Sequence, residues 1–182
     1  MREGVGRFLG EHLAYLKQGF SFSGYERDLL CLNTRDGRFL DISGASGADS
    51  ISDGRAAVFV DYDDDGDTDI FLRAMHGPAH FLFRNEVGQR RKSVRVEILG
   101  TRSGRDAFGT VVRMKTSQGI LAKVKSGGCG FLAQHDPRLL FGLGDDDRAE
   151  WLEVTWPGGR TERLPGPRAG DRVRLVEPGA GR

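Results

Sequence analysis

The chain of 182 residues, 38% hydrophobic and 29% charged, has the balance of a folded globular protein and not that of a disordered one. Because no apolar run approaches the roughly 20 residues of a membrane-spanning helix, we expect no membrane insertion. The formal net charge of +1 gives no general attraction to nucleic acid or to anionic lipid.

The first twenty residues predict a short helix. Leu9, Leu13 and Leu16 give it an apolar face, and Gly19 is placed to end it. The same segment lacks the apolar core of a signal peptide, so the sequence predicts none.

The rest of the chain has the pattern of short strands joined by tight turns, with 27 glycines, several of them in turn dipeptides. Segments 28–33 and 38–42 flank a turn at 34–37 and predict a hairpin. Further strands are predicted at residues 56–60, 70–73, 80–84, 94–99, 109–115, 120–125, 150–156, 161–164 and 172–176. We therefore predict a mainly β protein whose C-terminal part is a sandwich or barrel.

A polar, basic stretch at residues 85–92 is the predicted domain boundary. The expected organisation is an N-terminal helical segment (1–20), a propeller-like blade (21–90), a small β domain (91–178) and a tail (179–182).

Lysine and arginine far outnumber acidic residues between positions 84 and 125. The solvated faces of alternating strands explain this excess. A surface that recognises an anionic polymer remains the alternative, although the stretch lacks the interleaved aromatic residues that single-stranded nucleic acid requires.

Aspartates are concentrated in the segment 60–71, which reads VDYDDDGDTDIF. Asp61, Asp63 and Asp65 alternate, and Gly66 permits the sharp turn that directs alternate side chains into a curled loop. Calcium takes six to eight oxygen ligands, which a loop supplies by curling round the ion. The spacing therefore predicts a calcium site.

Two further positions complete the predicted ligand set. Asp69 closes it, and a backbone carbonyl near Asp67 fills the seventh position of the loop. The side chains of Asp64 and Asp67 are then expected to face outward. Two carboxylates 4 Å apart at an effective dielectric of 20 repel by about 4 kcal/mol, so a compact loop needs a cation or protonation.

Three other structures compete with a calcium loop as the interpretation of this segment. An EF-hand expects a glutamate at its twelfth position between two helices, whereas the twelfth position here is Leu72 and both flanks are strand-like. Magnesium prefers fewer carboxylates and several retained waters. A solvated acidic turn without an ion is the third.

The DxDxDGxxD layout between two apolar strands resembles the calcium loop of FG-GAP (VCBS-type) repeats, as found in integrin β-propellers and their bacterial relatives. The resemblance implies that the ligands are the side chains of Asp61, Asp63, Asp65 and Asp69, assisted by the backbone of Asp67.

Four strings of the second half resemble the ASPIC/UnbV domain of the cartilage acidic protein family and its bacterial homologues: GRDAFG (104–109), SGGCGFLAQHDP (126–137), FGLG (141–144) and WPGG (156–159). This resemblance runs from about residue 93 to 177, and residues from 20 onward resemble the blade that precedes the domain. Cys129 and Thr110 stand where the family usually has small residues and alanine, respectively.

A propeller needs four or more blades to close, and only one is visible here. We therefore expect this blade to pack on the C-terminal domain, on other copies in a homo-oligomer, or within a larger assembly, because its edges are otherwise exposed.

These features predict a non-catalytic, calcium-binding structural or interaction module whose partner is a protein or a glycan. The family also implies an alternative, an accessory role in natural-product (enediyne-type) biosynthesis. It suggests an extracellular or periplasmic location, which the missing signal peptide leaves open.

Other residues that could form a catalytic site or a second metal site are better explained as ordinary structural or surface residues. Cys129 and His135 are separated by an apolar stretch, with no residue to orient the histidine. His76 and His80 flank a Gly-Pro pair that excludes a helical metal site. The acidic run at 145–147 reads as a solvated turn. Cys31 and Cys129 stand in no metal-ligand spacing, and whether they form a disulfide is left open.

Overall fold

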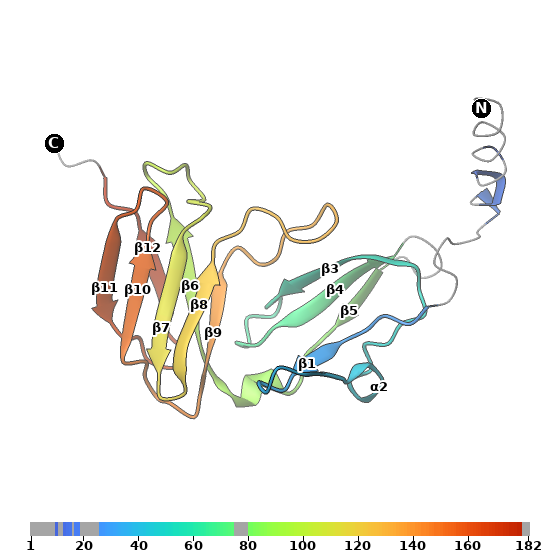
Figure 1. Ribbon diagram of the computed structural model, residues 1–182, viewed down its shortest axis with the longest axis horizontal. Coiled ribbons are helices and arrows are strands. Elements are labelled where there is room, and N and C mark those ends of the chain that lie inside the picture. Colours follow the sequence, from blue (N-terminus) through green and yellow to red (C-terminus); the bar gives the residue numbers. More distant parts are fainter. Residues whose placement is uncertain (1–9, 11–12, 16, 19–25, 75–79, 180–182) are drawn as a thin grey trace. The chain divides into compact units, whose positions relative to one another are not determined.

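A computed structural model describes residues 10, 13–15, 17–18, 26–74 and 80–179. Most of the regular structure in these residues is strand, so the predicted mainly β fold class is confirmed (Figure 1). The predicted N-terminal helix lies largely outside the described residues; of the described ones in this segment, 10, 13–15 and 17 are helical. None of the described helices has the length and apolarity needed to cross a membrane.

The chain divides into two compact units. The first comprises residues 1–57 and 72–83, and the second comprises residues 58–71 and 84–182. The aspartate loop therefore groups with the C-terminal β domain.

The first unit contains the predicted hairpin, formed by β1 (Cys31–Asn33) and β2 (Phe39–Asp41). Its turn includes Arg35 and Gly37, both with positive φ. A single helical turn, α2 (Ser43–Ser46), follows. Cys31 lies at the exposed start of the hairpin and carries a free thiol, as does Cys129 of the second unit.

A three-stranded sheet has the order β3-β4-β5, with bounds β3 (Gly54–Val60), β4 (Asp69–Ala74) and β5 (His80–Phe83). The aspartate loop connects β3 to β4, as the sequence predicts. A short 3-10 helix, η1 (Gly88–Arg90), then leads into the second unit.

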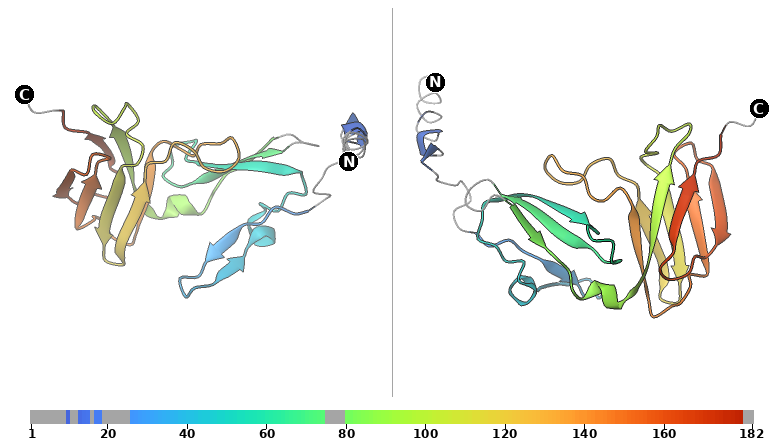
Figure 2. Two further views of the ribbon diagram at one scale, coloured as in Figure 1. Left: turned by 45° about the horizontal axis from the view of Figure 1, so that its top comes forward. Right: turned by 180° about the vertical axis from the view of Figure 1, so that it is seen from behind.

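The second unit is built from two sheets, and its strands close no barrel within the described residues. One sheet is antiparallel with the order β11-β10-β7-β8: β7 (Val111–Thr116), β8 (Gly119–Val124), β10 (Trp151–Thr155) and β11 (Thr161–Pro165). The other has the order β12-β6-β9: β6 (Lys92–Leu99), β9 (Leu139–Gly144) and β12 (Arg172–Val176). In it, β6 runs parallel to β12 and antiparallel to β9 (Figure 2).

One hydrophobic core lies between these two sheets. Alternate residues of each strand point into it because successive side chains of a strand face opposite sides. The sheet of β6 contributes Val94, Val96, Phe141 and others, and the sheet of β7 contributes the following buried residues: Val112, Met114, Leu152 and Val154. Fully burying one such side chain stabilises the fold by about 1.5–3 kcal/mol.

The three residues that precede the GRDAFG string, 101–103, are hydrogen-bonded to Glu177, the residue that follows β12. Oε2 of Glu177 accepts hydrogen bonds from the backbone N–H groups of Thr101, Arg102 and Ser103 at 3.0, 2.8 and 2.9 Å. Oε1 accepts one from the Ser103 hydroxyl at 2.7 Å. These bonds, the hydroxyl first, lower the pKa of Glu177 to about 2. These bonds therefore anchor the start of the loop that carries the string.

Candidate metal centre

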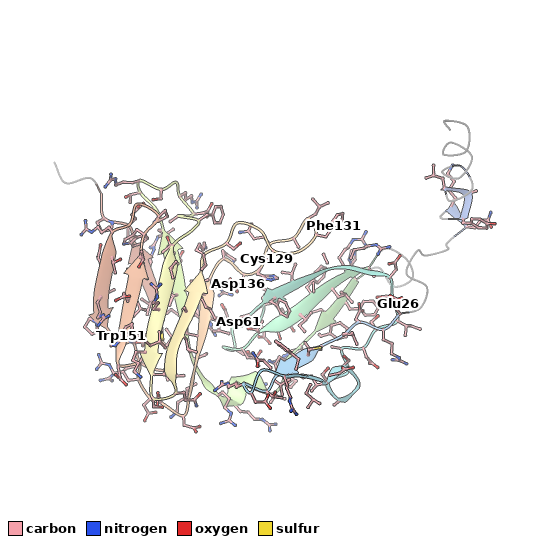
Figure 3. The ribbon with its side chains drawn as sticks, viewed as in Figure 1. Glu26, Asp61, Cys129, Phe131, Asp136 and Trp151 are labelled. Atoms are coloured by element: carbon pink, nitrogen blue, oxygen red, sulfur yellow. The ribbon has the colours of Figure 1, made fainter. Side chains whose placement is uncertain are left out.

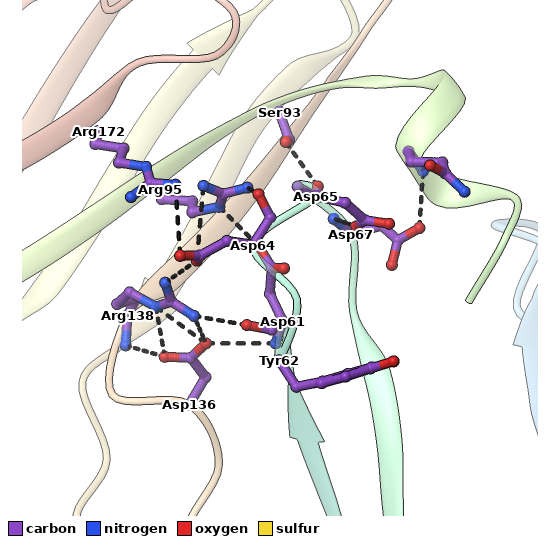
Figure 4. Close-up of polar contacts among 12 residues, drawn as sticks. Asp61, Tyr62, Asp64, Asp65, Asp67, Ser93, Arg95, Asp136, Arg138 and Arg172 are labelled. Carbon is purple, nitrogen blue, oxygen red and sulfur yellow. Dashed lines mark hydrogen bonds and ion pairs between the residues drawn. The ribbon is translucent and has the colours of Figure 1, made fainter. Parts of the chain in front are cut away.

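The aspartate loop curls because two of its residues adopt left-handed backbone conformations. Asp64 has φ of 62° and Gly66 has φ of 99°. Glycine takes this conformation without steric cost, and aspartate tolerates it better than most residues do. The Ser93 hydroxyl of β6 donates a 2.7 Å hydrogen bond to the Gly66 carbonyl and so holds the turn (Figure 4).

Three predicted ligands converge within this curl. Asp61, Asp63 and Asp65 each offer a carboxylate oxygen, and these oxygens lie within 4.8 Å of one another. Such a cluster could hold a metal ion. Asp61 starts the loop from the end of β3 and is buried, whereas Asp63 and Asp65 are partly buried.

Buried oxygens without a hydrogen-bond donor are concentrated in the same place. They are Asp61 Oδ1, both oxygens of Asp63, Asp65 Oδ2 and Asp67 Oδ1. Elsewhere in the described part of the chain, the only such oxygens belong to Asp28 and Glu162. A buried acceptor that receives no hydrogen bond costs about 1–3 kcal/mol, and more when it is charged. This ligand set fits a cation, which would compensate the converging oxygens of Asp61, Asp63 and Asp65.

Asp67 lies differently from the sequence prediction. Its side chain was expected to face outward, but the residue is only 4% exposed. Oδ2 accepts a 2.8 Å hydrogen bond from the backbone N–H of Gln89 in η1, and Oδ1 remains unpaired. Burial, followed by repulsion from Asp65, raises the pKa of Asp67 to about 6. The outward prediction is wrong because η1 supplies a partner that the loop sequence does not contain.

Asp69 is fully buried and joins the two ends of the loop. Its Oδ2 accepts from the backbone N–H of Tyr62 at 3.2 Å, and its Oδ1 accepts from that of Asn85 at 2.8 Å. It is not part of the cluster formed by the three alternating aspartates. Its role as a metal ligand stays a prediction.

Three arginines anchor the outer side of the loop (Figure 4). Arg95 of β6 donates from Nε to Asp61 Oδ2 at 2.7 Å and from a terminal nitrogen to the Asp64 carbonyl at 2.6 Å. Arg138 contacts the Asp64 carboxylate and the Asp61 carbonyl, and Arg172 of β12 lies 3.5 Å from Asp64. The Arg138 hydrogen bond lowers the pKa of Asp64. Asp64 therefore faces away from the cluster, as expected.

Arg84 lies beside the cluster and compensates part of its charge. Its Nε is 2.9 Å from Asp63 Oδ2, and a terminal nitrogen is 3.9 Å from Asp65 Oδ2. Its Nε is also 3.1 Å from Glu86, whose charge, followed by that of Asp63, raises the pKa of Arg84. A cation at the cluster therefore competes with this guanidinium for the same oxygens.

We expect Arg84→Gln to tighten calcium binding about two- to fivefold, because the ion then has no resident charge to displace and solvent screens the exposed Arg84 guanidinium. Isothermal titration calorimetry would measure it. Arg90→Gln is the matched control, since the Arg90 side chain is exposed in η1, six residues along the chain. Equal affinities of the two variants would contradict a competing role for Arg84.

The other candidate site residues have local partners. His135 Nδ1 accepts a 3.2 Å hydrogen bond from the Phe59 backbone, and its ring packs edge-on against that of Phe59. Cys129 lies in the loop before β9 (Figure 3), where its N–H donates to the Ala133 carbonyl at 2.9 Å. His80 begins β5, whereas His76 lies outside the described residues.

The acidic run at 145–147 does not converge on one point. Asp145 contacts Arg91 at 3.3 Å, Asp146 accepts from the Ser117 backbone at 2.7 Å, and Asp147 lies 2.9 Å from Lys92. These separate partners fit the predicted solvated turn.

Comparison with known proteins identifies the C-terminal region. Residues 100–182 match the family model described as "ASPIC and UnbV". Cartilage acidic protein 1 of Homo sapiens, of Mus musculus and of Xenopus tropicalis is in each case 36% identical over 110 residues, which cover 59% of this chain. The match covers 16% of the human relative and 17% of the other two. The chain thus spans about a sixth of the length of these relatives.

The family match begins beyond the aspartate loop, so the assignment of that loop to FG-GAP repeats stays a prediction. The match does include residues 101–103, the GRDAFG string and the strands from β7 onward. Residues 100–182 therefore form an ASPIC and UnbV domain, homologous to part of cartilage acidic protein 1.

Proposed function

We propose that this chain is a calcium-binding structural and interaction module without catalytic activity. The observation that carries the proposal is the set of buried carboxylate oxygens on Asp61, Asp63, Asp65 and Asp67 that accept no hydrogen bond, of which Arg84 approaches only Asp63 Oδ2 and Asp65 Oδ2. Calcium suits this set better than magnesium does, because it accepts many carboxylate oxygens in irregular geometry. Asp67 Oδ1 adds a candidate ligand to the backbone carbonyl that the sequence predicts.

Calcium would stabilise more than the loop itself. Arg95 and Arg138 join the loop to β6 and to the residue before β9, within the same compact unit. An ion that binds only the folded loop adds its binding free energy to the stability of that unit. The ion would thus act as a structural element of the β domain.

The partner of such a module is a protein or a glycan, and an extracellular or periplasmic setting supplies the calcium. Completion of the three-stranded sheet by other copies or by a larger assembly belongs to the same proposal. The relatives reported above are not named for natural-product biosynthesis, so that alternative gains no support from them.

Thermal unfolding with calcium and with chelator tests the proposal. At a free calcium concentration 100 times the Kd, binding adds about 2.7 kcal/mol. This corresponds to a rise in Tm of roughly 5–10 °C for a chain of this size. The rise should vanish in the Asp63→Asn, Asp65→Asn double variant. Its calcium-free form should melt no lower than the wild type, because two repelling charges are removed.

The matched control is Asp145→Asn with Asp147→Asn, which removes two carboxylates outside the loop and should keep the full calcium effect. A Tm that calcium leaves unchanged in the wild type, or that rises equally in the loop variant, would overturn the proposal.

A further inference from the structure

A buried lysine of the second unit lacks a counter-ion. Lys125 follows β8 directly and is only 4% exposed. Its ammonium group donates to the Pro137 carbonyl, and none of the described carboxylates lies within ion-pair distance of it. Lysine is almost never fully buried unless it is paired, because burying an uncompensated charge is costly.

The surroundings of Lys125 are cationic. Lys125 borders a cavity of about 510 Å³ that is also lined by five arginines: Arg95, Arg105, Arg138, Arg172 and Arg174. Among its described lining residues only Glu97 and Asp106 are acidic. Lys125 also borders a second cavity of about 410 Å³, lined in part by Lys123 and Ser126.

Most of these arginines already form ion pairs. An anion would therefore bind where a cationic side chain has no such partner. Arg95 and Arg138 are held by the aspartate loop and Asp136, and Arg174 lies 3.6 Å from Glu97. The Arg105 side chain makes no ion pair within the described residues, like that of Lys125. Burial lowers the pKa of Lys125, and the charges of Asp106, Asp136 and Glu97 act on it only from longer range.

The size and lining of the cavity indicate the class of ligand. A volume of about 510 Å³ exceeds the need of a bare inorganic ion and falls in the range of small-molecule sites. None of the described residues that line it is aromatic, so these residues offer no stacking platform for a nucleobase. We propose that this cavity binds an organic anion of small-molecule size, whose carboxylate, sulfate or phosphate group pairs with Lys125 and Arg105.

This site stands on observations separate from those of the calcium loop. It uses neither the cluster of alternating aspartates nor the ion, so it should bind its ligand in the presence of chelator. Failure of either proposal therefore leaves the other standing.

Calorimetry and thermal-shift measurements on the full chain test the proposal. The ligands are glucuronate, glucose 6-phosphate and inorganic sulfate, each added in the presence of chelator and at low ionic strength. Glucose is the neutral control. We expect one of the organic anions to bind, and Lys125→Met and Arg105→Gln each to weaken its binding at least tenfold. Arg160→Gln, on an exposed turn of the other sheet, should bind like the wild type.

The ligand-free Lys125→Met variant separates a binding role from a structural one. If Lys125 serves to bind an anion, removing its buried charge should leave the Tm of the ligand-free protein unchanged or raise it. A lower Tm, together with unchanged anion binding, would assign Lys125 to structure alone and overturn the proposal. Equal responses of all variants would also overturn the proposal, because they indicate general charge screening. Binding of sulfate but of neither organic anion would overturn it too, because it indicates an adventitious ion only.

Discussion

Replacing Arg95 with methionine is expected to lower the free energy of unfolding of the calcium-free protein by about 3 kcal/mol. Arg95 and Asp61 form a buried pair, with side chains 12% and 4% exposed and a 2.7 Å contact. Asp61 Oδ1 already lacks a donor, so the substitution would leave the whole carboxylate uncompensated. Denaturant-induced unfolding would measure the loss.

Calcium should recover much of this loss, because the ion compensates the same carboxylate. The control is Arg160→Met, which removes an exposed partner of Glu162 and should cost less than 1 kcal/mol with or without calcium. If Arg95→Met costs no more than the control, the Arg95–Asp61 pair does not hold the loop.

Replacing Gly166 with alanine is expected to cost on the order of 3 kcal/mol or more, and to reduce the yield of folded protein. A Cβ atom at Gly166 would lie 1.9 Å from the Ala149 carbonyl oxygen and 2.4 Å from its carbon. These are backbone atoms, and they are held in place by a 2.9 Å hydrogen bond from the Ala149 N–H to the Pro167 carbonyl. No flexible side chain can yield, so two backbone segments must separate. Urea unfolding of the purified variant would measure the cost.

Gly158→Ala is the comparison for this substitution. A Cβ atom at Gly158, in the turn after Trp156, would have no neighbour within 4 Å. Its change in stability should fall within about 0.5 kcal/mol. If the two variants unfold at the same urea concentration, the backbone at Gly166 does not approach the Ala149 carbonyl as closely as described.

The fold was predictable where hydrophobic alternation is strong. Val94, Val96 and Ile98 alternate with polar neighbours, and β6 was predicted within two residues of its bounds. β9 was not predicted as a strand, because Gly142 and Gly144 make its FGLG string look like a strand end with glycine corners. The parallel pairing of β6 with β12 has no local signal at all, since it depends on how the whole domain closes.

The candidate site was predictable to the extent that it is local. The DxDxD spacing alone predicts that Asp61, Asp63 and Asp65 converge, because it fixes which side chains point into the curl. The burial of Asp67 depends on Gln89, and the anchoring of the loop depends on Arg95 and Arg138. These partners lie 22 residues or more along the chain, so no spacing rule connects them to the loop. The basic stretch at 84–125 was the available signal, but it favoured a solvated face.

The parallel pairing of β6 with β12 also governs the order in which the second unit can form. β6 is the first strand of its sheet to be synthesised and β12 is the last, yet they are hydrogen-bonded neighbours. Bringing them together closes a loop that contains all the other strands of the two core-forming sheets. The entropic cost of this closure precedes the contacts that it permits. Until then one edge of β6 stays open to pairing with other chains. Folding of this unit is therefore completed only after its final strand is made, and its nascent form is the state most exposed to aggregation.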